Sequence, residues 1–281
     1  MNKQTYTQEV VNLHTHSYYC GHGVGEVSEY AEQGLKQGLQ VLGFSEHCPV
    51  FDDRWARTRM PRQMLLPYNQ DCLAIREDYA EKLVILRGLE CDYLPQYKSY
   101  YTDYILGELG CDYLLFGVHD LSLDLDTEFS LFGNRLGPKD LFAYTDMYLK
   151  ALQSGLFLFG AHPDVFTYNY RTWDAEAIAC SKAILECAAS NAIPLEINAN
   201  GMRKKKIETD RGLRYAYPLS EFWKLAANYP VKVLCNSDAH RPEFVNDRYP
   251  ECKAFADECK LSLASYRIEE KESGKYDIAI L

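Results

Sequence analysis

The stretch "YLLFGVH" (113–119) is a short apolar run that ends in a histidine, and "LFLFGAH" (156–162) repeats the same "FG-x-H" ending. Runs of this kind, rich in aliphatic and aromatic residues, are typical of buried β-strands. Similar runs occur at five other places, "VVNL" (10–13), "VLGF" (41–44), "LVILRGL" (83–89), "IPLEIN" (193–198) and "VKVLCN" (231–236). The sequence therefore predicts seven strands.

Helix-like segments alternate with these strands. Examples are "EVSEYAEQGLKQG" (26–38), "PKDLFAYTDMYLKALQSG" (138–155) and "LSEFWKLAANY" (219–229). Strand–helix alternation predicts a parallel sheet, and this many repeats in one domain favour a closed β/α barrel. A doubly wound open sheet is also compatible with the pattern alone. No linker or change in composition divides the chain, so we expect residues 1–281 to form a single domain.

Composition limits the classes of function. A net charge of −10 argues against a surface that attracts nucleic acid or anionic lipid, but bound metal ions can still reverse the field around a small anionic substrate. The ten cysteines form no CxxC pair, and we expect them to be reduced and mostly buried. The N-terminal "MNKQTYTQEVV" has no apolar signal stretch, and no run approaches a membrane span. We therefore expect a cytoplasmic protein.

Every histidine lies at, or just beyond, the C-terminal end of a predicted strand. The seven are His14, His16, His22, His47, His119, His162 and His240. Glu90 ends the third strand, and Asp238 follows the seventh. In β/α barrels this is the face that carries the active site. A single histidine in such a place is more often structural, but that explanation would have to hold independently for all seven.

The spacing of these residues suits metal ligation. His14 and His16 are two residues apart, so their side chains point the same way from an extended strand, and Asp238 and His240 repeat this spacing. Imidazole and carboxylate together suit zinc, iron or manganese, and the absence of cysteine from the motifs argues against a structural zinc cluster. Seven histidines with one Glu and one Asp make nine candidate ligands, which is enough for two or three ions with a bridging carboxylate.

The motifs together resemble those of the polymerase-and-histidinol-phosphatase (PHP) family. They are "HTH" (14–16), "GH" (21–22), "SEH" (45–47), "GLE" (88–90), "GVH" (117–119), "GAHPD" (160–164) and "NSDAH" (236–240). The resemblance runs from about residue 10 to residue 245. Within the family, "HTHSYYCGHG", "GLECDYLP" and "EINANGMRK" look most like the stand-alone histidinol-phosphate phosphatases.

The resemblance implies a distorted seven-stranded (β/α) barrel and a set of metal ligands. His14, His16, Glu90 and Asp238 would hold a first ion. Glu90 would bridge to a second ion, held with His119 and His162. His22, His47 and His240 would hold a third.

Three features depart from the family pattern. Glu46-His47 stands where the family usually has Asp-His. "HPDVFTYNYR" (162–171) has no basic residue before Arg171, although these phosphatases often carry one closer to the histidine. The insert "DLSLDLDTEFSLFGNRLGPKD" (120–140) is long and acidic. These departures bear on the substrate more than on the type of reaction.

The expected reaction is hydrolysis of a phosphomonoester without a phosphoenzyme. A metal cluster lowers the pKa of bound water toward about 7 and supplies hydroxide at neutral pH. We expect Glu90, Asp238 and His240 to take part in catalysis. No G-x-S-x-G elbow, P-loop or Rossmann glycine motif competes for this role.

Two regions are candidates for binding the phosphate group. Arg203 follows the sixth strand, and its guanidinium could hold two phosphate oxygens, whereas Lys204 to Lys206 are expected to form a solvated charge run. The loop "DDRWARTRMPR" (52–62) offers Arg59 among four arginines, either to close over an anionic substrate or as a plain surface loop. Cys20 is expected to line the site, not to act as a nucleophile.

The leading hypothesis is a histidinol-phosphate phosphatase that acts on L-histidinol phosphate in histidine biosynthesis. The first alternative is a PHP phosphoesterase for another small ester, such as a nucleotide or sugar phosphate. A binuclear amidohydrolase is disfavoured because the sequence offers nine ligands and no lysine at the end of the fourth strand. A non-catalytic metal-binding module would usually have lost a ligand. The sequence does not determine the oligomeric state.

Overall fold

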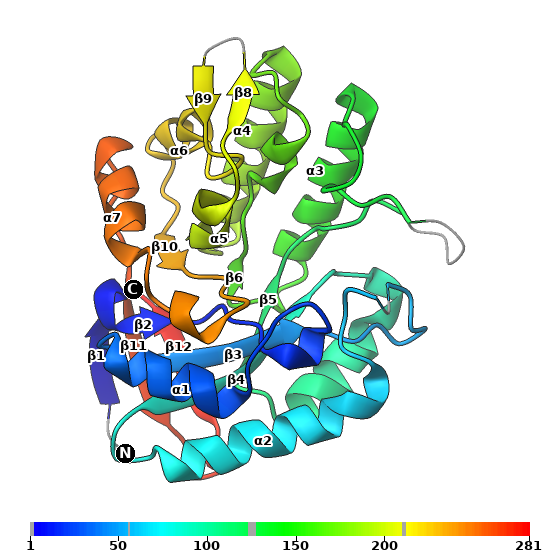
Figure 1. Ribbon diagram of the computed structural model, residues 1–281. Helices are drawn as coiled ribbons and strands as arrows, with labels where there is room; N and C mark the ends of the chain where they lie inside the picture. Colours follow the sequence, from blue (N-terminus) through cyan, green and yellow to red (C-terminus); the bar gives the residue numbers. More distant parts are fainter. Residues whose placement is uncertain (1–2, 56, 123–127, 210–211) are drawn as a thin grey trace.

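The seven predicted strands form one parallel sheet. The computed structural model describes residues 3–55, 57–122, 128–209 and 212–281 (Figure 1). The strands are β2 (Val11–Asn12), β3 (Val41–His47), β4 (Val84–Cys91), β5 (Tyr113–Phe116), β6 (Phe159–Gly160), β7 (Leu195–Asn198) and β10 (Val233–Asn236). Their order is β10-β7-β6-β5-β4-β3-β2, and each pair is parallel. The predicted strands are confirmed, although β2, β5, β6, β7 and β10 are shorter than expected and β3 and β4 are longer.

The two outer strands, β2 and β10, approach each other and nearly close the sheet into a barrel. Thr15 and Ala239 form an isolated parallel bridge just beyond the strand ends. The N–H of Leu13 donates to Asn236 Oδ1 at 2.8 Å, and Asn12 Nδ2 donates to Ser237 Oγ at 2.7 Å. Side-chain amides thus replace part of the missing backbone ladder. This confirms the distorted seven-stranded barrel and excludes the open sheet.

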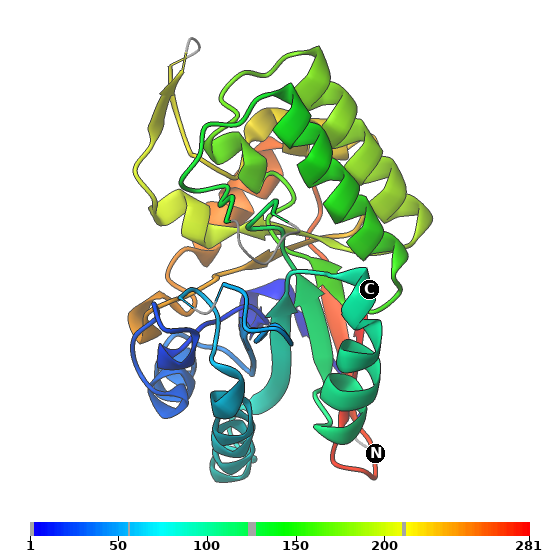
Figure 2. The same cartoon turned by 90° about the vertical axis from the view of Figure 1, so that its right-hand side faces the viewer.

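Helices cover the outside of the barrel. They are α1 (Val27–Lys36), α2 (Leu65–Asp78), α3 (Pro138–Gln153), α4 (Ala175–Ser190), α5 (Ala199–Arg203), α6 (Ser220–Ala226), α7 (Tyr249–Glu258) and a π-helix (Tyr100–Glu108). Short 3₁₀ turns lie at Gln8–Val10, Tyr18–Cys20, Arg62–Met64, Pro95–Tyr97, Val165–Tyr168 and Pro242–Phe244. Helices α1 and α2 lie on one side of the barrel, and α3 and α4 lie on another (Figure 2). One face of α1 is buried at Val27, Tyr30, Ala31 and Gly34.

A three-stranded antiparallel sheet, which the sequence pattern did not predict, closes one end of the barrel. It contains β1 (Lys3–Thr7), β11 (Ser265–Glu270) and β12 (Tyr276–Ile280) in the order β1-β11-β12. Tyr266 and Ile268 of this sheet pack in one cluster with Leu13, Leu86 and Leu234 of the barrel interior. The hairpin of β8 (Ile207–Thr209) and β9 (Gly212–Arg214) was also not predicted.

Along each barrel strand every second side chain points inward, and these inward positions continue from the apolar core to the C-terminal end of the barrel. In β4, Leu86 belongs to the interior cluster, and Glu90 lies four residues further on the same face. Tyr113 and Leu115 of β5 lead in the same way to His119, and Leu234 of β10 leads to Asp238. The strands therefore deliver polar side chains to one end of the barrel.

Within the part of the chain that the structure describes, the ten cysteines form no disulfide, and all except Cys187 are buried, which confirms the expectation that most of them are buried. Among the described helices, none combines the length and the apolar character that crossing a bilayer requires.

Candidate metal centre

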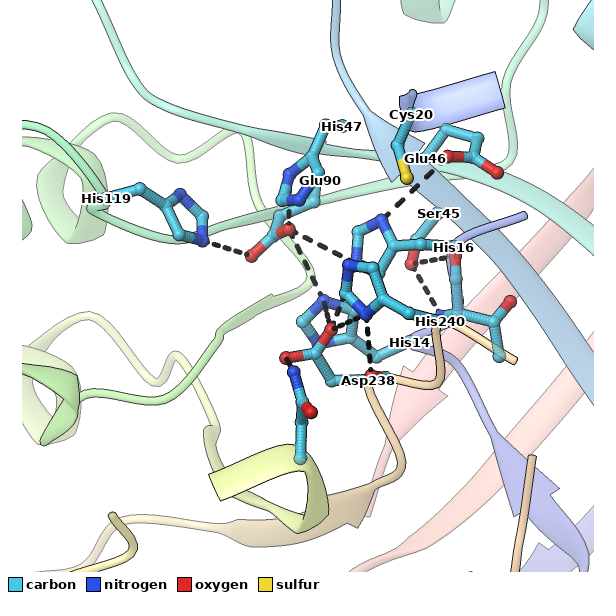
Figure 3. Close-up of polar contacts among 12 residues, drawn as sticks. His14, His16, Cys20, Ser45, Glu46, His47, Glu90, His119, Asp238 and His240 are labelled. Carbon is cyan, nitrogen blue, oxygen red and sulfur yellow. Dashed lines mark hydrogen bonds and ion pairs between the residues drawn. The ribbon is translucent and has the colours of Figure 1, made fainter. Parts of the chain in front are cut away.

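The structure brings the nine predicted ligands together at the C-terminal ends of the barrel strands. Figure 3 shows seven of the nine, Glu90 among them. His47 and Glu90 lie at the ends of β3 and β4, and His119 and Asp238 lie just beyond the ends of β5 and β10. His162 lies within 3.0 Å of Glu90, and His22 lies within 3.0 Å of His240. The sequence reasoning therefore found residues that form one cluster.

Glu90 lies at the middle of the cluster and is 1% exposed. Its two oxygens face different histidines. Oε2 lies 3.5 Å from His14 Nε2, 3.4 Å from His16 Nε2 and 2.9 Å from His47 Nδ1. Oε1 lies 3.4 Å from His119 Nε2 and 3.0 Å from His162 Nε2. This division is the geometry expected of a carboxylate shared between two cations.

Asp238 completes a group with the two histidines of the first strand. Its Oδ1 lies 3.2 Å from His16 Nε2 and 3.7 Å from His14 Nε2. His14, His16 and Glu90 form one compact set of ligand atoms that could hold a metal ion. The four side chains therefore lie around one position, where the resemblance placed a first ion.

A third set lies at the solvent-exposed edge of the cluster. His22 Nε2 and His240 Nε2 are 3.0 Å apart, and His47 belongs to the same compact set. His22 Nδ1 lies 3.1 Å from the carbonyl oxygen of Cys20, and His240 Nδ1 lies 3.1 Å from that of Asp238. Because a carbonyl only accepts hydrogen bonds, each Nδ1 carries the proton, and each Nε2 keeps its lone pair for a cation.

Buried polar atoms without hydrogen-bond partners test whether metal ions fit this site. His14 Nε2, His16 Nε2, His47 Nδ1 and Glu90 Oε2 are buried and have no hydrogen-bond partner among the described residues. Ligand bonds of about 2.1 Å at angles between octahedral and tetrahedral separate neighbouring donor atoms by about 3.0–3.4 Å. Most separations in the cluster are close to this range. The residues therefore fit divalent metal ions.

A second layer of polar groups orients the histidines. His14 Nδ1 lies 2.8 Å from Glu196 Oε1, and His119 Nδ1 lies 3.1 Å from Asp92 Oδ1. Asn200 Nδ2 donates to Asp238 Oδ2 at 3.2 Å. A carboxylate behind a histidine fixes the ring and makes the other nitrogen a better ligand. Sequence reasoning did not identify Glu196 or Asp92, although both are acidic residues at or next to predicted strands.

The local charges divide the histidines into two kinds. Burial and the nearby His240 lower the pKa of His16 to about 3 and that of His22 to about 4, so both rings are neutral at neutral pH. Burial also acts on His119, but the charges of Glu90 and Asp92 outweigh it and raise the pKa of His119 to about 9. Burial alone would raise the pKa of Glu90, yet His119, His14 and His47 hold it well below its usual range. Glu90 is therefore ionised.

The backbone is unusual at two of the ligands. His162 has a φ of 30° and Asp238 a φ of 47°, in a region that residues other than glycine seldom adopt. Such conformations occur most often at functional sites. Ala161 packs into the barrel interior, so regular alternation along an extended strand would point the next side chain, His162, away from it. The turn at His162 reverses this and brings its ring to Glu90.

A cavity of about 490 Å³ opens directly over the cluster. Its wall includes ligands from all parts of the cluster, among them His22, His119, His162 and Asp238. The remaining lining residues include Trp55, Arg57, Thr58, Arg59, Asp120, Glu128, Ser130, Phe132, Asn200, Lys204 and Tyr217. The loop 52–62 and the insert 120–140 both contribute to this wall, while residues 123–127 of the insert lie outside the described residues.

The structure places the two predicted phosphate-binding arginines differently. Arg59 lines the cavity, where its guanidinium pairs with Asp92 and donates to the carbonyl of Thr58 at 2.8 Å. Arg203 is absent from the described lining, because its guanidinium pairs with Asp247 and donates to the carbonyl of Ser237 at 2.7 Å. Arg203 also donates to the carbonyl of Phe244 at 2.8 Å. This placement favours Arg59 over Arg203 as a group near the substrate.

Lys204 and Cys20 also lie near the site, and the structure shows how each compares with its expected role. Lys204 was expected in a solvated charge run, yet it is partly buried in the cavity wall with its Nζ 5.4 Å from the centre of the Phe132 ring. The Cys20 thiol is fully buried, and burial raises its pKa, so it remains protonated. This agrees with the expectation that Cys20 is not a nucleophile.

The chain is similar in sequence to a known protein family and to two named relatives. The sequence profile of the family described as "PHP domain" matches residues 12–200. The chain is 30% identical over 244 residues to a probable histidinol-phosphatase of Deinococcus radiodurans, covering 85% of this chain and 89% of the relative. It is 26% identical over 278 residues to a histidinol-phosphatase of Bacillus subtilis, covering 88% of this chain and 98% of the relative.

A solved structure shares the fold. It is the crystal structure of histidinol phosphate phosphatase from Lactococcus lactis subsp. lactis complexed with zinc, L-histidinol and phosphate. The match has a TM-score of 0.69 and covers 96% of this chain and 99% of the other. The sequence identity is 17%, so this likeness speaks for the barrel fold alone.

Proposed function

Because this chain belongs to the PHP family, we propose that it is a metal-dependent phosphomonoesterase that hydrolyses L-histidinol phosphate. The observation that carries the proposal is the cluster of nine ligands around Glu90, whose two oxygens face separate sets of histidines. The Bacillus subtilis relative is named histidinol-phosphatase and the Deinococcus radiodurans relative probable histidinol-phosphatase, and the related solved structure contains L-histidinol and phosphate.

The proposed cofactor is a set of two to three divalent ions, with zinc, iron or manganese as candidates. His14, His16, Glu90 and Asp238 would hold one ion, and Glu90, His119 and His162 a second. His22, His47 and His240 would hold a third. When bound, divalent ions in such a cluster lower the pKa of water and neutralise charge on phosphoryl oxygens.

The residues of the chain itself have three tasks in this reaction. Asp92 and Glu196 orient His119 and His14, which keeps the ligand nitrogens aimed at the cluster. Arg59 and Lys204 add positive charge to the cavity wall and thereby favour a phosphate dianion. The surrounding wall limits the ester to a small molecule, since the cavity holds about 490 Å³.

A comparison of phosphate esters tests this function. Metal-loaded protein is assayed for phosphate release from L-histidinol phosphate, a nucleoside monophosphate and a sugar phosphate, with chelator-treated protein as the control. We expect kcat/KM to be highest for L-histidinol phosphate, and we expect the chelator to abolish turnover. A clear preference for a nucleotide or sugar phosphate would support the alternative PHP phosphoesterase and contradict our substrate assignment.

A further inference from the structure

We propose that Asp120 binds a positively charged group of the substrate, so that the site selects phosphate esters that also carry an ammonium group. This inference rests on the proposed phosphatase function and names what the cavity recognises besides phosphate. Asp120 directly follows the ligand His119, lines the cavity over the cluster and is only 5% exposed.

The hydrogen bonds of Asp120 use one of its two oxygens. Oδ1 accepts from the N–H of Ser122 at 2.8 Å and from the N–H of Phe129 at 3.1 Å, and it also accepts from the Ser122 hydroxyl. Within the described chain, Oδ2 has no hydrogen-bond donor. These bonds fix the orientation of the carboxylate of this cavity-lining residue and do not use Oδ2.

The backbone around Asp120 is itself held in place. Asp120 and Ser130 form an antiparallel bridge, the N–H of Leu121 donates to the carbonyl of Phe129 at 3.0 Å, and the N–H of Leu131 donates to that of His119 at 2.9 Å. The insert is thus tied to the strand end that supplies a metal ligand. A preorganised carboxylate at this position requires little further ordering when a ligand binds.

Asp120 has no positive partner in the described part of the protein. No Lys, Arg or His side chain there pairs with it, and it belongs to none of the compact ligand sets of the metal cluster. Arg59, the buried cation of the same cavity, is paired with Asp92 instead. A buried carboxylate that has hydrogen bonds but no positively charged partner is costly, so a cation supplied by the ligand would be favoured there.

The neighbouring wall suits the rest of such a substrate. The ring of Phe132 lines the same cavity, is 36% exposed and stands 6.3 Å from the ring of His119. It offers an apolar face for a ring or alkyl group, while the metal cluster receives the phosphate. In L-histidinol phosphate the ammonium group is bonded to the carbon next to the phosphate-bearing carbon, so both charges must be accommodated close together.

The test compares two esters that differ only in the ammonium group. Kinetics of Asp120→Asn are measured with L-histidinol phosphate and with its deamino analogue, and metal content is determined in parallel. We expect kcat/KM for L-histidinol phosphate to fall about ten- to a hundredfold, while the value for the deamino analogue changes less than about twofold. Metal content should equal that of the wild type.

Glu128→Gln provides the matched control, because Glu128 lies in the same wall but is exposed to solvent. We expect this variant to lose less than about threefold toward either ester, since exposed charges interact weakly. Equal losses at Asp120 and Glu128 would indicate general attraction and overturn the proposal. An equal loss of Asp120→Asn toward both esters, or a wild type indifferent to the ammonium group, would overturn it as well.

A second pair of esters separates this inference from the proposed function. If the wild type does not hydrolyse L-histidinol phosphate, the substrate assignment fails, and phosphoethanolamine is then compared with ethyl phosphate. A preference for phosphoethanolamine that disappears in Asp120→Asn would still support recognition of an ammonium group. No preference in that pair would overturn this proposal too.

Discussion

At the scale of single residues, the chemistry of the site depends on how its charges are paired. Glu90 is buried among five histidines, and its two oxygens serve different sets of them. The sequence allowed these ligands to be predicted because each one follows an apolar strand. It could not show that Arg203 would be held by Asp247, because that contact joins residues far apart in the chain.

Replacement of Glu90 by Gln is expected to reduce activity at least about a hundredfold and to lower metal content. The amide keeps the size of the side chain but removes the charge that two cations would share. Turnover and metal analysis of the purified variant check this expectation. Glu32→Gln, at an exposed surface pair with Lys36, is the control and should behave as the wild type. Near-normal turnover with full metal content in Glu90→Gln would show that Glu90 does not bridge.

The two arginines are expected to respond differently to substitution. Arg59→Lys should lower kcat/KM about ten- to a hundredfold. A lysine ammonium cannot pair with Asp92 and also present a planar guanidinium to the phosphate in the cavity, as Arg59 can. Arg203→Ala should leave kcat/KM within about threefold of the wild type but lower stability by about 1–3 kcal/mol, through the lost hydrogen bonds to Asp247 and two carbonyls. Kinetics and thermal unfolding of both variants measure this. The reverse pattern would return the phosphate-binding role to Arg203.

Metal binding is expected to release protons. In the metal-free protein the pKa of His119 is raised to about 9, so its ring is protonated at neutral pH, and a cation has to displace that proton. The apparent metal affinity should therefore rise with pH up to about pH 9 and fall as the pH is lowered. Calorimetric titration of the metal-free protein in buffers of different ionisation enthalpy counts the protons. Binding without proton release at neutral pH would contradict this.

At the scale of elements, the short "FG-x-H" motif predicted both a strand and a ligand because the histidine lies just beyond the end of the strand. Alternation places every second side chain inward, so Tyr113 and Leu115 fill the barrel and His119 reaches the site. Periodicity could not predict β8 and β9, which are only three residues each, or β11, whose sequence "SYRIEE" mixes charged and apolar residues. The positive φ of His162 and of Asp238 likewise follows from tertiary contacts, which no local pattern reports.

The glycine of "FGVH" is expected to be required for the cluster. A Cβ at Gly117 would lie 2.6 Å from His162 Cε1, 2.7 Å from Glu90 Oε1 and 2.8 Å from His119 Cε1. Gly117→Ala should therefore displace ligands and cause a loss of metal and of activity by at least about tenfold. Gly133→Ala is the control, because a Cβ there meets no atom within 4 Å. Equal metal content and activity in the two variants would contradict the close packing.

At the scale of the whole molecule, the apolar core that stabilises the barrel and the polar site that would carry out the reaction lie at opposite ends of the barrel. One end is closed by β1, β11 and β12 over an apolar interior, and the other end carries the cluster and its cavity. The sequence predicted the barrel because its strands are strongly apolar. It did not predict the closing sheet, because β1 pairs with a strand more than two hundred residues away along the chain.

The metal content of the purified protein, measured together with its phosphatase activity, tests the central claim most directly. Protein prepared without chelator should contain two to three equivalents of transition metal, in line with the ligand sets around Glu90 and His240. Removing the metal should abolish hydrolysis of L-histidinol phosphate, and adding it back should restore hydrolysis. A folded protein that holds one equivalent or none and still hydrolyses the ester at full rate would contradict the account.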